Sequence, residues 1–242
     1  MIIAQYFIEF IFYSFLGWIW ESIYCTVKEK KWADRGFLFG PICPIYGSCV
    51  VVTSIVFSLI PALSDSSFPI WGTFIICYLG SAVAEFGTSW VLEKRFHARW
   101  WDYSHMPLNI QGRICVPISC AFGIAGVLIV KYLIPFVTDT RSFFNPYVTI
   151  LFSLILAMIF GADFALTEAS LSALLKNVEE IHQEFNEKAQ GNYERIAYYS
   201  ARLSLNEKRI LGNMKKYIPE KRLSLELAES KRKLIEHMKS RL

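Results

Sequence analysis

The sequence predicts an all-α protein: a polytopic membrane bundle of about five transmembrane helices, followed by a helical cytoplasmic C-terminal tail. Three observations support this fold class. The chain of 242 residues is 54% hydrophobic and 19% charged, and its apolar residues are gathered in long blocks. Loops rich in Lys and Arg alternate with loops that contain few. Residues 170–242 carry 15 of the 25 Lys and Arg and 10 of the 21 Asp and Glu, so the tail is polar and basic.

Five blocks are long enough to cross a bilayer, which takes about 20 mostly apolar residues in a helix. All five precede residue 170, so we expect a transmembrane domain over 1–169 and a tail over 170–242. The first block contains two acids and has no basic N-terminal region, unlike a cleaved signal peptide. The predicted spans lie near Ile2–Val27, Phe37–Ile60, Pro69–Leu92, Ile114–Val137 and Pro146–Leu166.

The charges of the connecting loops predict the orientation. Cytoplasmic loops of membrane proteins are enriched in Lys and Arg. The second connection has no Lys or Arg and the fourth has only Arg141, whereas the first and third are basic. We therefore expect the N-terminus outside and the tail in the cytoplasm. The basic residues that decide this are Lys28, Lys30, Lys31 and Arg35 in the first connection, and Lys94, Arg95, Arg99 and Arg113 in the third.

Glu21 and Glu85 are carboxylates inside predicted spans, and the sequence around them is repeated. Each lies about 10 Å from the cytoplasmic end of its span at 1.5 Å per residue. After each acid comes a similar stretch, "RGFLFGPICPIYG" (35–47) and "QGRICVPISCAFG" (111–123), with the shared pattern G-x4-P-I-x3-[YF]-G. The first two spans thus correspond to the third and fourth. This predicts a duplicated two-helix hairpin, an arrangement in which transporters bind substrates at the repeat interface.

Several stretches of the membrane domain resemble a known family. The motifs "YSFLGWIWES", "RGFLFGPICPIYG", "AEFGTSW", "WWDYS" and "NIQGRIC" are similar to those of the CmpB-like ABC-transporter (type IV) permease family of bacterial membrane proteins. The resemblance covers about residues 5–165. It implies a multi-spanning protein of the bacterial plasma membrane and assigns no role to the tail.

Two roles are open for the intramembrane acids. An ionisable residue inside a span marks a functional site by default, and Glu21 and Glu85 can form a proton-binding or cation-binding pair near the repeat axis. Alternatively, each acid forms a structural ion pair with Arg35 or Arg113, which stand at the cytoplasmic mouth of the following span. The bidentate guanidinium group suits a carboxylate.

The connection over residues 93–113 is the richest polar patch. Trp101 and its aromatic neighbours suit the headgroup region of a bilayer. Asp102, Asn109 and Arg113 can either hold the loop in place or bind a lipid or another anionic group. We therefore count these four residues among the candidate binding residues.

No cofactor or metal site is expected. His97, Asp102 and His105 are three potential ligands in one loop, too few for a zinc site without a fourth. The cysteines have no C-x-x-C spacing and suit apolar packing better than a disulfide framework. They are Cys25, Cys43, Cys49, Cys77, Cys115 and Cys120.

The tail shows helical periodicity in three segments. The first carries apolar residues at intervals of three and four, as in a short coiled-coil seam: Leu171, Leu174, Val178, Ile181 and Phe185. The second carries Ile196, Tyr199, Leu203, Ile210, Met214 and Tyr217, and a third begins at Pro219. We expect the tail to pack on itself or on a second chain, with binding of its basic residues to anionic lipid as the alternative.

The motifs of several enzyme classes are absent from the sequence: G-x-x-x-x-G-K-[ST], G-x-S-x-G and H-E-x-x-H. A permease of the ABC type would therefore need a separate ATPase, docking on the basic cytoplasmic loops and tail. We expect a transport-associated membrane protein that binds its substrate near Glu21 and Glu85. The alternatives are a membrane-embedded enzyme acting on a lipid-linked substrate, and a non-transporting scaffold or sensor that recruits a partner through its tail. Nothing indicates a nucleic-acid partner, and a homo-oligomer fits the tail seam.

Overall fold

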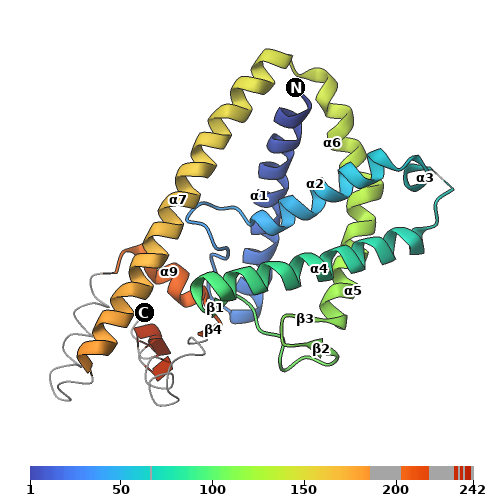
Figure 1. Ribbon diagram of the computed structural model, residues 1–242. Helices are drawn as coiled ribbons and strands as arrows, with labels where there is room; N and C mark the ends of the chain where they lie inside the picture. The colour runs from blue at the N-terminus through green and yellow to red at the C-terminus, as the bar shows by residue number, and fades with distance from the viewer. Residues whose placement is uncertain (66, 186–202, 218–231, 234, 237, 241–242) are drawn as a thin grey trace. The chain divides into compact units, whose positions relative to one another are not determined.

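The computed structural model describes residues 1–65, 67–185, 203–217, 232–233, 235–236 and 238–240 (Figure 1). The chain forms two compact units. Unit 1 comprises Met1–Thr88 and Tyr103–Ala162, and unit 2 comprises Ser89–Asp102 and Asp163–Leu242. Two long helices, α4 and α7, contribute residues to both units.

Within the described residues, four helices are long and apolar enough to cross a membrane: α1 (Ile2–Glu29), α4 (Ile70–Phe96), the rod Val116–Thr140, and Pro146–Lys176 within α7 (Pro146–Phe185). Each exceeds the hydrocarbon thickness of about 30 Å at 1.5 Å per residue. Large apolar side chains on α7, including Leu151, Leu154 and Met158, are exposed. Such a surface is unfavourable in water and suits lipid. A mostly helical, multi-pass membrane fold is thereby confirmed.

The second predicted span differs from the expectation. Helix α2 (Pro44–Leu59) has 16 residues, about 24 Å, which is shorter than the hydrocarbon core. The expected count of five spans is therefore not confirmed. The helix predicted to begin near Phe37 begins at Pro44 instead, because proline lacks an N–H and is suited to the first turn of a helix. A single turn, α3 (Pro61–Ser64), follows α2.

The residues between α1 and α2 follow an irregular path back along α1. Helix α1 ends where Lys30 adopts a left-handed backbone conformation (φ 54°). Four α1 positions spaced by four residues, and so on one face of the helix, hold the returning chain. The hydrogen bonds run from Ala33 N to Thr26 Oγ1 (3.0 Å), from Arg35 N to Ser22 Oγ (3.2 Å), from Trp18 Nε1 to Asp34 Oδ1 (2.8 Å) and from Cys43 N to Ser14 O (2.9 Å).

This returning segment explains why hydropathy alone misplaced the start of the second helix. Irregular backbone is tolerated at membrane depth only where protein covers it. Residues 36–43 of the segment carry no charge and are as apolar as a membrane helix. Leu38 and Cys43 among them are buried. Its backbone groups are partly satisfied by α1 side chains instead of by helical hydrogen bonds.

The rod Val116–Thr140 contains one irregular turn. Helix α5 (Val116–Leu128) passes through a π-helical turn, η1 (Ile129–Leu133), into α6 (Ile134–Thr140), and the three run on as one rod (Figure 1). Pro135 stands in the first turn of α6 and cannot donate the hydrogen bond that an α-helix requires there. The wider turn accommodates this missing donor. A 3₁₀ turn, η2 (Arg141–Phe143), then leads to α7.

Both hairpins of the predicted repeat close around a glycine. A Cβ atom added to Gly47 on α2 would lie 2.2 Å from the carbonyl oxygen of Phe10, and one added to Gly123 on α5 would lie 2.6 Å from the ring of Phe74. Gly47 and Gly123 are equivalent in the shared pattern. Phe10 and Phe74 are also equivalent, because they precede Glu21 and Glu85 by the same number of residues. The same pair of positions therefore makes the close contact in each hairpin.

The glycine that opens each copy has a positive φ angle. Gly36 and Gly112 have positive φ values of 124° and 69°. Glycine adopts such angles readily, whereas other residues are strained there. A duplicated hairpin would produce this correspondence.

A short β-hairpin lies in the connection between α4 and α5. Strands β2 (Asn109–Ile110) and β3 (Ile114–Cys115) pair antiparallel, with Asn109 opposite Cys115. The Asn109 side chain closes the turn: its Oδ1 accepts from Gly112 N (3.1 Å) and its Nδ2 donates to Met106 O (2.8 Å). Tyr103 N donates to Gly112 O (2.8 Å). The hairpin therefore fixes the backbone at Tyr103.

Unit 2 contains a small strand pair and a capped helix. Strand β1 (Ala98–Arg99) pairs antiparallel with β4 (Lys216–Tyr217). Helix α9 (Leu205–Asn213) begins with a capping box, in which Ser204 Oγ accepts from Glu207 N and the Glu207 carboxylate accepts from Ser204 N. Arg95 also forms an ion pair with Glu168.

The tail follows the predicted pattern only in part. Leu171 and Leu174 of the seam are buried, as are Ile210 and Met214 of the second segment. The second helix ends at Asn213, and Tyr217 belongs to β4. The side chains of residues 177–185, and the whole of Ile196, Tyr199 and Pro219, lie outside the described residues, so the coiled coil stays a prediction.

Candidate functional site

The two intramembrane acids each accept a hydrogen bond from a tyrosine hydroxyl. Glu21 projects from α1, and its Oε1 accepts from Tyr46 Oη of α2 at 2.6 Å. Glu85 projects from α4, and its Oε1 accepts from Tyr103 Oη of the following connection at 3.2 Å. All four residues belong to unit 1. Tyr46 comes from the partner helix of the same helical hairpin, and Tyr103 comes from the connection between α4 and α5, ahead of β2.

The two copies of the repeat meet beside these acids. Tyr46 and Phe122 are equivalent in the shared pattern, and their rings touch in an edge-on arrangement with centroids 5.9 Å apart. Equivalent residues of two copies contact each other only near the axis that relates the copies. The Tyr46 ring also lies on Gly17 of α1, where an added Cβ atom would come within 2.4 Å of it. Tyr46 therefore connects Glu21 to the interface between the hairpins.

The site is negatively charged and partly closed to solvent. Glu85 is 6% exposed, and its Oε2 has no hydrogen-bond partner among the described residues. Glu21 lies close enough to Glu85 for the two carboxylates to repel each other. Burial, reinforced by the charge of Glu85, raises the pKa of Tyr103 above its usual value, so the Tyr103 hydroxyl remains a donor at neutral pH.

The structure does not show the ion pairs considered for these acids. Within the described residues, neither Arg35 nor Arg113 pairs with Glu21 or Glu85. The Arg113 guanidinium lies 5.5 Å from the centre of the Phe86 ring, and its Nε donates to Gln111 Oε1 at 3.4 Å. Arg35 lies in the returning segment, where its backbone N–H donates to Ser22 Oγ of α1. The arginine pairing was one of the two alternatives for these acids, and in the structure each acid accepts a hydrogen bond from a tyrosine hydroxyl instead.

The other candidate residues are distributed over both units. Trp101 and Asp102 are half-buried in unit 2, whereas Asn109 and Arg113 belong to unit 1. Asn109 holds the β2–β3 turn, the structural role considered for it. Binding of a lipid or anionic group by these residues stays a prediction. In the part of the chain that the structure describes, no group of three or more His, Cys, Asp or Glu side chains is arranged to hold a metal ion.

Sequence reasoning missed an ion pair near the opposite end of α1. Arg141 binds the buried Glu9 through two parallel hydrogen bonds, Nε to Oε1 (2.5 Å) and Nη2 to Oε2 (2.8 Å), and its guanidinium lies 4.8 Å from the centre of the Tyr6 ring. The hydrogen bonds to Glu9 raise the pKa of Arg141 above its usual value. Arg141 is the lone basic residue of its loop, which was the one available signal.

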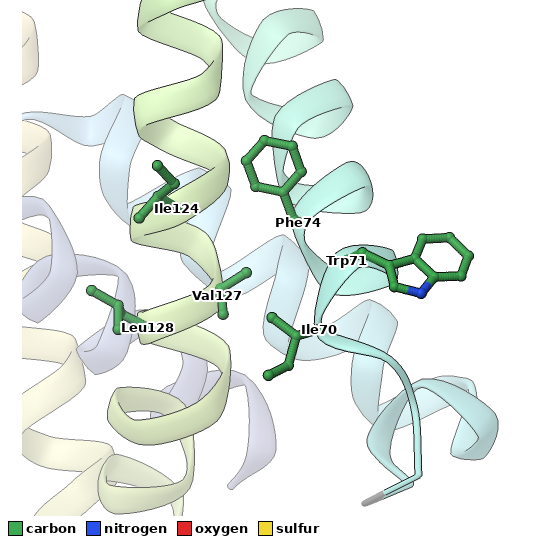
Figure 2. A pocket seen from close by; sticks show the side chains of 6 residues that line it. All are labelled: Ile70, Trp71, Phe74, Ile124, Val127 and Leu128. Atoms are coloured by element: carbon green, nitrogen blue, oxygen red, sulfur yellow. The ribbon is translucent and has the colours of Figure 1, made fainter.

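A separate apolar pocket opens between the beginning of α4 and the end of α5 (Figure 2). Its volume is about 620 Å³. Phe74 of this pocket precedes Glu85 by about three turns of α4, roughly 16 Å along the helix, so the pocket is distinct from the paired acids. Its lining contains no ionisable side chain and consists of Ile70, Trp71, Phe74, Ile124, Val127 and Leu128.

Comparison with known proteins identifies the family. The sequence model of one family, described as "Putative ABC-transporter type IV", matches residues 8–168, which include both hairpins and both acids. No curated protein and no solved structure matches the chain. The match covers well over half of the chain and agrees with the motif resemblance, so the chain belongs to this ABC-transporter type IV family.

Proposed function

We propose that this protein is a permease-type membrane subunit that binds its substrate between its two hairpins, beside Glu21 and Glu85. The contact between the equivalent rings of Tyr46 and Phe122 carries the proposal, because Tyr46 holds Glu21 beside the interface of the repeats. Glu85 lies within electrostatic range of Glu21. Transporter folds built from repeats bind substrates at that interface. Ionisable residues inside spans are costly and mark functional sites by default.

The charge of the site favours a positively charged species. Glu21 and Glu85 bring up to two negative charges, and their hydrogen-bond donors, Tyr46 and Tyr103, are neutral. The aromatic faces of Tyr46 and Phe122 add a surface that attracts cations. An anion would meet two like charges here, so we propose a cation or a proton as the bound species.

The energy for transport comes from outside this chain in the proposed arrangement. The sequence has no G-x-x-x-x-G-K-[ST] motif, so a separate ATPase docks on the cytoplasmic face. We propose that this face carries the basic first and third connections and the tail, with the N-terminus outside the bacterial plasma membrane.

The test uses the full chain purified in mild detergent from its native membranes. We expect a co-purifying polypeptide that hydrolyses ATP, and uptake of radiolabelled methylammonium or Na⁺ into vesicles that contain the complex. Glu21→Gln should reduce this uptake at least about tenfold, a difference of about 1.4 kcal/mol in binding. Asp65→Asn, which neutralises an exposed acid outside the spans, should leave uptake unchanged.

A negative result in both assays would contradict the proposal. If no ATPase accompanies the chain and vesicles with the protein take up neither probe faster than empty vesicles, the permease proposal is wrong. The lipid-linked enzyme and the scaffold would then be the remaining hypotheses.

A further inference from the structure

The two repeat-related acids are held by hydrogen bonds of different strength. The bond from Tyr46 Oη to Glu21 is 2.6 Å long, within the range of about 2.5–2.7 Å that is typical of a hydroxyl donating to an ionised carboxylate. The bond from Tyr103 Oη to Glu85 is 3.2 Å long, beyond the usual range of about 2.5–3.0 Å between two oxygens. Glu21 therefore has the geometry of a charged acceptor, and Glu85 does not.

The second oxygen of Glu85 adds an independent observation. Glu85 Oε2 is buried and accepts no hydrogen bond from any described residue. An ionised carboxylate that is buried without a cation or several donors is strongly unfavourable, and the group is more stable when neutral. A proton on Oε2 removes the charge at the oxygen that no donor stabilises.

Among the residues that the structure describes, no cationic side chain pairs with Glu85. Glu21 approaches from α1 and is itself negative. Cys49 on α2 and Tyr103 on the following connection lie within electrostatic range of Glu85, and both are neutral at neutral pH. Arg113 is the nearby basic residue of that connection, and its guanidinium lies over Phe86 without pairing with Glu85.

We infer that Glu85 is a proton-binding site: its carboxyl group carries a proton on Oε2, whereas the equivalent acid, Glu21, accepts the short hydrogen bond from Tyr46. Binding takes one proton from water and forms one O–H bond, which turns the Glu85 carboxylate into a neutral acid. Loss of that proton leaves two carboxylates at the repeat interface and creates a stronger site for a cation. The inference deepens the proposed function and rests on it for the role of the proton in transport.

The experiment is site-resolved labelling of the full-length protein with dicyclohexylcarbodiimide, which reacts with protonated carboxyl groups in apolar surroundings. The protein is treated at about pH 7, digested, and the modified acids are quantified by mass spectrometry. We expect at least about tenfold more label on Glu85 than on Glu21, because Glu85 Oε2 is the buried oxygen without a donor. Glu9 is the matched control, because it is equally buried but both of its carboxylate oxygens accept hydrogen bonds from Arg141.

Three results would overturn the inference: equal labelling of Glu21 and Glu85, stronger labelling of Glu21, or no label on Glu85. A second readout does not depend on the reagent: the infrared band of a protonated carboxyl group should be present in the wild type and lost in Glu85→Gln. Its persistence in that variant would also overturn the inference. Labelling reports on the isolated protein and does not depend on transport. A protonated Glu85 without cation uptake would refute the proposed permease and keep the proton site. Cation uptake without a protonated Glu85 would refute the proton site and keep the permease.

Discussion

Neutralising one member of the Glu9–Arg141 pair should destabilise unit 1 much more than neutralising an exposed ion pair. The two residues are far apart in sequence, and their two parallel hydrogen bonds connect α1 to the turn before α7. The Glu9 side chain is 6% exposed and that of Arg141 is 23% exposed. Glu9→Gln leaves the guanidinium beside a neutral amide that can accept only one of the two hydrogen bonds.

The expected magnitude follows from this geometry. A hydrogen bond to a charged group contributes about 1.5–3 kcal/mol, so two such bonds give roughly 3–6 kcal/mol. Arg141 is partly exposed and can turn toward water when its partner is lost, which favours the lower end, about 3 kcal/mol for either single variant. Breaking a buried pair from one side costs more than removing both charges. The double variant Glu9→Gln/Arg141→Gln should therefore recover about 1–2 kcal/mol relative to the sum of the single variants.

Equilibrium unfolding in mixed detergent micelles, followed by tryptophan fluorescence, measures these differences. The matched control is the Arg95–Glu168 pair, whose side chains are 56% and 33% exposed. Exposed pairs contribute about 0–1 kcal/mol, so Glu168→Gln should change stability by less than about 1 kcal/mol. A coupling energy between Glu9 and Arg141 no larger than that of the control would refute the assignment of a buried, strongly coupled pair.

Three further perturbations test other parts of the structure. Gly47→Ala places a Cβ atom 2.2 Å from a backbone oxygen and should destabilise the α1–α2 hairpin by about 1–3 kcal/mol. Gly161→Ala, whose Cβ atom would have nothing within 4 Å, should leave stability unchanged. Equal thermal stability of the two variants would contradict this packing. Burial raises the pKa of Tyr103 above its usual value of 10.0, so the folded state keeps a proton that the unfolded chain loses at alkaline pH. The contribution of Tyr103 to stability should therefore be constant below about pH 10 and fall above it. Alkaline unfolding of Tyr103→Phe should lack that contribution. In a cysteine-free background, an impermeant thiol reagent added to intact cells should label Asp65→Cys and not Lys30→Cys, and the reverse pattern would invert the proposed orientation.

The repeat was predictable from sequence because it depends on residue types with few substitutes. Gly36 and Gly112 need positive φ, and Gly47 and Gly123 need the absence of a Cβ atom. Such requirements keep glycine at fixed spacing even inside an apolar block. Hydropathy, by contrast, could not separate the returning segment before Pro44 from a helix, because both are apolar.

The partners of the acids were not predictable. Tyr46 is visible in the shared pattern, but nothing in the pattern says that its hydroxyl reaches Glu21. Tyr103 reaches Glu85 only because the β2–β3 hairpin folds its loop back toward α4. The Glu9–Arg141 pair joins the two ends of unit 1, and contacts of such long sequence separation leave no local signal.

Duplication itself accounts for the asymmetry of the site. An exact repeat of the first hairpin would bring two ionised glutamates to one axis, each with its own tyrosine donor, and their repulsion inside a membrane would be costly. The second copy has Phe122 where the first has Tyr46, so it lacks the short hydroxyl bond that stabilises a charged acid. The longer loop of the second copy supplies Tyr103 instead, at a distance that holds Glu85 in place without stabilising its charge as strongly. One hairpin thus holds its acid by a short hydroxyl bond, and the other holds an acid whose charge can be removed by a proton, which allows two carboxyl groups to share the repeat interface.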